Sequence, residues 1–173
     1  MESFINIPVS TLRTMIPIVK ERFVRFFGMI FRIPQVEYGE KTTLIAVNLG
    51  GVVIPALVSF YLMWRQPASV FYALMGVLLV TIVTKVVAKP VRVRGITMPA
   101  FVSPLVAAAI AYLLPSGVPT VVAYVSGVLG TLIGADVLNL NTIPDLGAPI
   151  VSIGGVGTFD GVFMSGILAV LLV

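Results

Sequence analysis

The chain contains no cysteine and no histidine, and each absence excludes a class of chemistry. Without cysteine there are no disulfides and no thiol nucleophiles, and without either residue the usual zinc sites and haem ligands are missing. The absence of histidine also removes the side chain most often used as a general base near neutral pH. We therefore expect no cofactor and no metal, and any catalysis must use Asp, Glu, Lys, Arg, Tyr, Ser, Thr or Asn.

Charged residues are also scarce, because they make up 10% of the chain while 58% of residues are hydrophobic. Soluble domains are roughly a quarter charged and about half apolar. A water-soluble fold of 173 residues has too little interior to hide this much apolar surface. A lipid bilayer is therefore the expected partner. The net charge of +4 indicates positive charge on the cytoplasmic side of a membrane protein and not nucleic-acid binding.

Residues 1–41 form the most basic segment, with six of the eleven Lys and Arg residues. Apolar residues from Ile16 to Ile30 recur on one helical face, and Arg22 and Arg25 fall on the other. This pattern predicts an amphipathic basic helix lying in the membrane interface, bounded or bent by prolines. We expect it to be separate from a transmembrane domain formed by residues 42–173.

Five apolar stretches follow, and each approaches the ~20 residues that a helix needs to cross a bilayer. They cover residues 42–64, 68–88, 96–114, 118–136 and 148–173. Turn residues separate them. The third stretch contains Pro99 and Pro104, so it is either broken near Ser103 or preceded by a short surface segment. The predicted fold class is all-α, a polytopic transmembrane bundle of about five spans with an N-terminal interfacial helix.

The distribution of basic residues predicts the orientation of this bundle. With five spans, ten of the eleven Lys and Arg residues lie on the side of the N-terminus and only Arg65 lies opposite. Because cytoplasmic loops carry the excess of positive charge, we expect a cytoplasmic N-terminus in the cell membrane. A re-entrant third stretch would invert the side on which the C-terminus lies.

Asp136 and Asp160 are the unusual residues, because acids inside spans cost ~2.5–3.5 kcal/mol at a helix centre and are usually functional. They flank the turn centred on 144–147 almost symmetrically, which predicts similar depths with an offset of ~5 Å. Two such carboxyl groups cannot both stay ionised in a low dielectric, so they titrate as a unit. Aspartic proteases use this arrangement: one carboxylate activates water and its neutral partner polarises the carbonyl.

Several residues around the two acids are candidates for binding a substrate or an ion. Glycines just before Asp160 weaken the last helix, and irregular backbone at membrane depth is tolerated where it lines a water-filled cavity. The candidates are Asn48, Asn139, Gly155, Gly157, Thr158 and Gly161. The alternatives remain open: the glycines suit close helix packing, Asn48 suits an interhelical hydrogen bond, and Asp136 suits a helix end at the interface. Asp145 is expected to be a turn residue.

Two resemblances rest on the last forty residues. The run IGADVLNL at 133–140, followed by VSIGGVGTFDG at 151–161, resembles an uncharacterised family of archaeal and bacterial multi-pass membrane proteins, a domain of unknown function. The same spans resemble the catalytic pair of GxGD-type intramembrane aspartyl proteases, the presenilin, signal peptide peptidase and prepilin peptidase group. That resemblance implies Asp136 and Asp160 as catalytic residues, although Thr158 and Phe159 separate the glycines from Asp160.

The sequence therefore predicts an intramembrane aspartyl-protease-like hydrolase that uses Asp136 and Asp160 to cleave a membrane-embedded peptide. One alternative is a proton- or cation-coupled transporter or channel subunit in which the same acids bind the ion. A second is a non-catalytic structural subunit whose partner supplies the activity. Five spans are few for an enclosed site, so we expect a homo-oligomer, which the spacing of Gly130 and Gly134 would favour.

Overall fold

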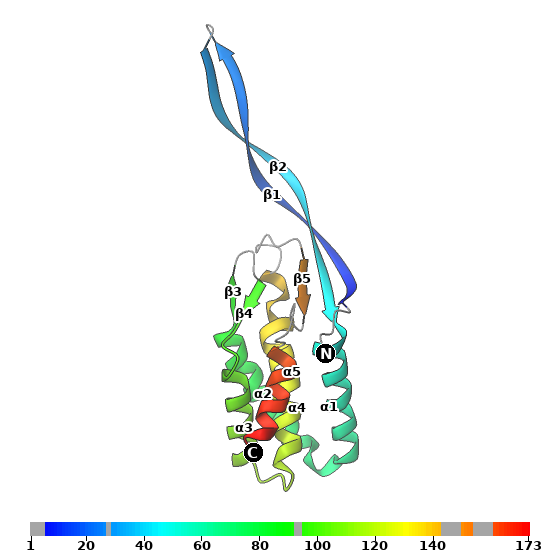
Figure 1. Ribbon diagram of the computed structural model, residues 1–173. Coiled ribbons are helices and arrows are strands. Elements are labelled where there is room, and N and C mark those ends of the chain that lie inside the picture. Colours follow the sequence, from blue (N-terminus) through cyan, green and yellow to red (C-terminus); the bar gives the residue numbers. More distant parts are fainter. Residues whose placement is uncertain (1–5, 27–28, 92–94, 143–149, 154–160) are drawn as a thin grey trace.

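The computed structural model describes residues 6–26, 29–91, 95–142, 150–153 and 161–173. It is a helical bundle from whose end a long β-hairpin extends (Figure 1). Five α-helices form the bundle: α1 (Ile54–Arg65), α2 (Val70–Val87), α3 (Val102–Leu113), α4 (Pro119–Thr131) and α5 (Gly161–Leu171). The predicted bundle of apolar helices is thereby confirmed in its helical character.

Short non-α turns extend three of these helices. The π-helical turn η1 (Leu49–Val53) precedes α1, and the 3-10 turn η2 (Pro67–Ser69) precedes α2. Helix α4 continues through the π-helical turn η3 (Leu132–Asp136) into the 3-10 helix η4 (Val137–Thr142).

Two of the resulting helices are long and apolar enough to cross a membrane by length and composition, Pro67–Val87 with 21 residues and Pro119–Thr142 with 24. These ranges match the second and fourth predicted stretches. The other three apolar helices have 10–17 residues each.

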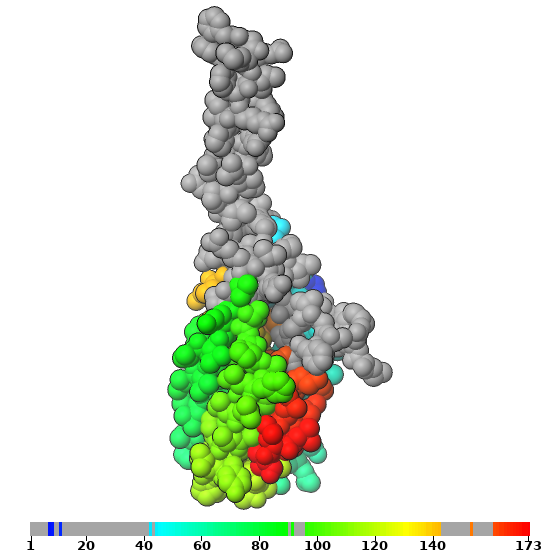
Figure 2. All heavy atoms as spheres, turned by 60° about the vertical axis from the view of Figure 1, so that its left-hand side comes forward, coloured from blue at the N-terminus to red at the C-terminus, as the bar shows by residue number. Residues whose placement is uncertain are grey.

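Helix α4 lies at the centre and contacts the other four α-helices. Small and β-branched residues fill the contacts, with Val80, Ala107, Val122 and Ala169 fully buried in one cluster. Such residues allow helix backbones to approach closely. Helix α5 lies on the surface of the bundle against α3 and α4 (Figure 2).

The N-terminal segment is the largest departure from the sequence prediction. Its described residues form two strands, β1 (Asn6–Phe26) and β2 (Met29–Asn48), paired antiparallel with one register shift near Pro8. The predicted interfacial helix is therefore wrong for these residues, and the fold is not all-α. A helix here would have to accommodate Pro17 in its interior at a cost of ~3 kcal/mol, whereas a two-stranded ribbon has free edges where proline is tolerated.

Strands also replace parts of three predicted spans. Strand β2 continues to Asn48, so the first predicted span shortens to η1 and α1. Strands β3 (Lys89–Val91) and β4 (Gly95–Thr97) form a small antiparallel pair, so the third span shortens to α3 and a surface segment precedes it. The fifth predicted span is not one continuous helix. Strand β5 (Ile150–Ile153) pairs parallel with β2, giving the order β1-β2-β5, and α5 covers Gly161–Leu171 of the described residues.

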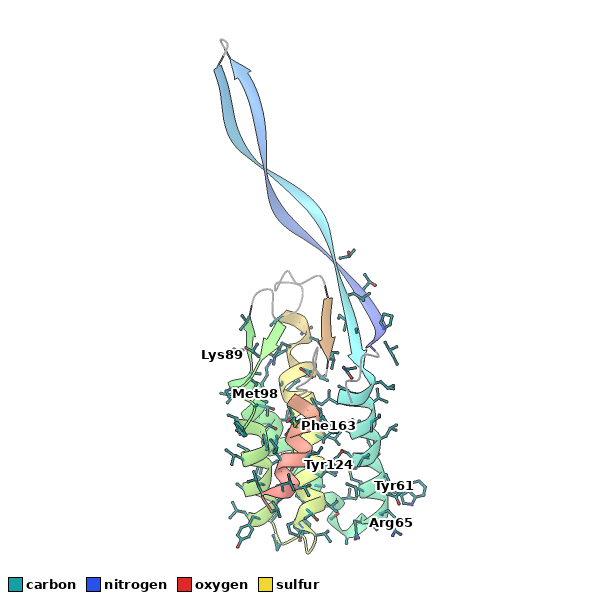
Figure 3. The ribbon with its side chains drawn as sticks, viewed as in Figure 1. Tyr61, Arg65, Lys89, Met98, Tyr124 and Phe163 are labelled. Carbon is teal, nitrogen blue, oxygen red and sulfur yellow. The ribbon has the colours of Figure 1, made fainter. Side chains whose placement is uncertain are left out.

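Basic residues in the bundle are separated by its length. Arg65 lies at the end of α1, and Lys89 lies at the opposite end, where the long hairpin begins (Figure 3). The predicted turn after Arg65 is present, because Ser69 Oγ donates a 2.8 Å hydrogen bond to the carbonyl of Gln66 at the start of α2. Gly117 forms the other predicted turn at this end with a φ of 72°.

Candidate functional site

The end of α4 changes its helical form where α2 approaches it most closely. A Cβ atom built on Gly130 would lie 2.6 Å from Val80 Cβ, and one on Gly134 would overlap Thr84 Oγ1. Only glycine at both positions allows this approach. Thr84 Oγ1 lies 2.8 Å from the Val80 carbonyl and 3.2 Å from the Gly130 carbonyl. The hydroxyl thus joins the two backbones directly.

Asp136 is the last residue of the π-helical turn η3 that follows this contact, and it is half-buried. A π-helical turn interrupts the regular i to i−4 bonding, and such turns occur frequently at functional sites. The neighbouring residues Gly134 and Ala135 are buried, whereas Val137 and Leu138 are 44% and 48% exposed. Asp136 therefore lies at the boundary between the packed interior and the accessible end of the bundle.

Asn139 and Lys85 hold this end of α4. The Asn139 amide nitrogen donates to the carbonyls of Gly134 at 3.2 Å and Ala135 at 2.9 Å. Its Oδ1 accepts a 2.7 Å hydrogen bond from Lys85 Nζ, which also donates to the Leu138 carbonyl at 2.6 Å. A cation near the C-terminal carbonyls of a helix satisfies unpaired acceptors and interacts favourably with the helix dipole.

Asn48 is a second buried amide and lies at the start of the bundle helices. Its Oδ1 accepts hydrogen bonds from the backbone N–H groups of Gly50 and Gly51, both at 3.0 Å. This is a helix N-cap on the π-helical turn η1, which packs against α5. Asn48 therefore lies on the α5 side of the bundle, and Asn139 lies on the α2 side.

Three buried hydroxyl groups join α3, α4 and α5. Ser103 is hydrogen-bonded to Thr131 and lies 2.6 Å from Ser165 Oγ. Thr131 and Ser165 both donate to the Gly127 carbonyl, at 2.6 and 3.0 Å. We call Ser103, Thr131 and Ser165 the hydroxyl cluster. Each hydroxyl proton has an acceptor inside the cluster or on α4, so the hydroxyl cluster links the three helices by hydrogen bonds.

The hydroxyl cluster fixes how α5 lies along α4. The two helices run in opposite directions (Figure 1), with Ser165 beside Gly127. Asp136 lies nine residues beyond Gly127, and Gly161 lies four residues before Ser165. The difference of five residues corresponds to ~7.5 Å along the bundle axis. Gly161 is exposed, and a Cβ there would meet no atom within 4 Å.

The structure locates four of the eight residues predicted for the site: Asp136, Asn139, Asn48 and Gly161. Asp136 and Asn139 lie in adjoining turns at the end of α4, whereas Asn48 and Gly161 belong to η1 and α5. The other four, Gly155, Gly157, Thr158 and Asp160, lie outside the described residues. Within the described ranges, no group of three or more acidic residues is placed to hold a metal ion.

Sequence reasoning missed Lys85 and the hydroxyl cluster. The hydroxyl cluster could have been predicted from the isolated Ser or Thr residues in the apolar stretches, because a hydroxyl in an apolar helix often forms a hydrogen bond to a neighbouring helix. Thr84, Ser103, Thr131 and Ser165 are all fully or almost fully buried.

These features define a mainly helical protein with two long apolar helices and a polar end on its central helix. The chain belongs to the family described as a protein of unknown function, DUF1614, which matches residues 1–172. The predicted membership of an uncharacterised family is therefore confirmed. No curated protein and no solved structure matches the chain.

Proposed function

We propose that this chain is an integral membrane protein whose bundle lies in the bilayer. The supporting observation is the outer surface of the bundle, where large apolar side chains on every peripheral helix are exposed. Examples are Leu57 at 62%, Val86 at 76%, Leu105 at 55% and Leu171 at 75%. Soluble proteins rarely expose contiguous apolar patches of this extent, whereas lipid covers them without cost.

Aromatic residues support the same placement. Tyr61 and Trp64 near the end of α1 and Tyr112 near the end of α3 are 63%, 86% and 80% exposed. Tyr61 lies beside Arg65 at one end of the bundle (Figure 3). Trp and Tyr concentrate at the membrane interface, where one part of the ring system is apolar and the other is wet. Resistance of the expressed chain to alkaline carbonate extraction tests insertion, and release into the supernatant would overturn it.

Within this membrane protein, we propose a hydrolytic site built on Asp136 and Asp160 that cleaves a membrane-embedded peptide. The observation that carries the proposal is Asp136 on a π-helical turn at the edge of the packed interior, with the open start of α5 at Gly161 only ~7.5 Å away along the bundle axis. Hydrolysis requires water beside the carboxyl groups, and Asp136 and Gly161 are both at least partly accessible.

The proposal is tested by replacing each acid separately, as D136N and D160N. Purified variants are reconstituted in proteoliposomes with a set of membrane-spanning peptides, and cleavage is followed by mass spectrometry. Both variants should lose activity by orders of magnitude, because a dyad works only with both carboxyl groups. D145N removes a neighbouring acid as a matched control and should retain activity. Cleavage by either D136N or D160N at the wild-type rate would end the dyad proposal.

The second candidate function is proton- or cation-coupled transport with the same acids as ion-binding groups. It is favoured by strand β5, which takes the place of helix in the first part of the fifth predicted span, since discontinuous helices form many transporter sites. Uptake of sodium-22 or a pH change inside proteoliposomes, lost in D136N without any peptide cleavage by the wild-type chain, would favour transport over hydrolysis.

A further inference from the structure

The far end of the β1–β2 hairpin has a composition unlike the rest of the chain. We define the distal hairpin as residues 22–26 and 29–33, which lie beyond the pair formed by Glu21 and Pro34. Three of these ten residues are arginines and seven are apolar. None is acidic and none is a neutral polar residue.

The distal hairpin stands far from the bundle. The third strand, β5, pairs with β2 only from Leu44 to Val47. Ile33 is eleven residues further along β2, which corresponds to ~36 Å of extended strand. The hairpin continues away from the bundle along its length (Figure 1). An isolated two-stranded ribbon is marginal in water, and one that is mostly apolar needs an apolar environment to cover it.

A second copy of this chain fits this composition poorly as the occupant. In the same membrane it would bring the two distal hairpins together at equal height, and each carries three positive charges that repel the other three.

An anionic membrane interface offers both an apolar environment for the seven apolar residues and negative charge for the three arginines. Its acyl region accepts Phe and Ile, and its negatively charged headgroups attract arginine. We propose that the distal hairpin binds the anionic headgroups of a second membrane that faces the one holding the bundle. The position of that second membrane rests on the bundle insertion proposed above, because the hairpin extends from the basic end of the bundle and away from it.

The test uses the full chain in vesicles of neutral phosphatidylcholine, mixed with dye-labelled vesicles that contain phosphatidylglycerol. Carbonate-resistant incorporation is measured first, so that failed insertion is distinguished from failed tethering. Co-flotation of the dye then reports binding to the second membrane. The wild-type chain should bring the labelled vesicles with it, and labelled vesicles of neutral lipid should stay behind.

The triple variant R22Q/R25Q/R32Q should lose on the order of a hundredfold in affinity for the anionic vesicles, from about a fivefold effect per arginine. The matched control R13Q/K41Q/R65Q removes three charges elsewhere and should bind like the wild type. The variant R22K/R25K/R32K keeps the charge and should also bind, which separates lost charge from a misfolded hairpin. Equal binding by the triple variant and the control, binding of neutral vesicles, or no tethering by inserted wild-type chain would overturn the proposal.

Discussion

The position of α5 along α4 decides how close its first residue lies to Asp136, and a single methyl group tests that position. Gly166 on α5 faces α4, and a Cβ there would lie 2.5 Å from Val128 Cγ2 and 3.1 Å from Tyr124 Cε2. A Cβ contact of 2.5 Å essentially never occurs in proteins, so Gly166→Ala forces α5 away or shifts Val128. Overpacking of this kind costs about 1–3 kcal/mol.

Gly161→Ala is the matched control on the same helix, because a Cβ at Gly161 meets nothing within 4 Å. Both substitutions gain the helix propensity of alanine over glycine, up to ~1 kcal/mol, so this gain largely cancels between them. The two variants should then differ by about 2 kcal/mol in the free energy of unfolding, with Gly166→Ala the less stable. For a chain of this length that difference is roughly 4–8 °C in melting temperature.

The assay is thermal unfolding in detergent micelles, followed by circular dichroism and by loss of the monodisperse peak in size exclusion. Val128→Ala supplies the rescue, because it removes the atom that the new methyl group would meet, and Val128 is fully buried. The double variant Gly166→Ala/Val128→Ala should be more stable than the sum of the single effects by about 1–2 kcal/mol. If Gly166→Ala melts no lower than Gly161→Ala, α5 does not pack on Val128 and Tyr124, and the depth assigned to Gly161 is wrong.

Two further predictions concern the polar ties around α4. Lys85→Met should lower the free energy of unfolding by about 1 kcal/mol and speed hydrogen exchange at residues 137–142, because the Leu138 carbonyl and Asn139 Oδ1 lose their charged donor. Lys85→Arg keeps a charged donor, so its amide hydrogens should exchange at the wild-type rates. Ser103→Ala and Thr131→Val should each lower the free energy of unfolding by about 1 kcal/mol. The double variant should lose less than the sum of the two single losses, since both residues belong to one hydrogen-bonded cluster. Strict additivity of the last two would show that the hydroxyl groups do not interact.

Local sequence patterns predicted that five apolar stretches contain helices, and the bounds agree most closely for the second stretch. Helix α2 is apolar on all sides and free of internal proline, so its extent follows from composition alone, and the prediction of 68–88 differs from the observed Pro67–Val87 by one residue at each end. The turns after Arg65 and at Gly117 were also predicted, because proline and glycine set the backbone angles there. Asp136 was selected because an acid inside an apolar segment is costly, and its functional role stays a prediction.

The N-terminal segment shows why the same method failed elsewhere. Residues 16–30 satisfy a helical period of 100° per residue, yet residues 16–26 pair as a strand with residues 29–39, up to 23 positions away in the pair of Ile16 with Gly39. Periodicity shows only which residues would share a face of one helix or strand. It carries no information on whether another segment of the chain is available to pair as a strand. The prolines and the many Ile, Val, Thr and Phe residues favour strands, and strand propensity is expressed only when pairing supplies the hydrogen bonds.

The sequence alone determined that this chain carries apolar helices with defined ends and a few costly polar residues, since each of those properties depends on neighbours along the chain. Only the tertiary structure decided that Lys85 reaches Asn139, that Ser103, Thr131 and Ser165 meet, and that residues 6–48 pair as a hairpin. Those contacts join residues tens of positions apart, and their geometry depends on how closely glycine allows two helices to approach or on which strand is available to pair.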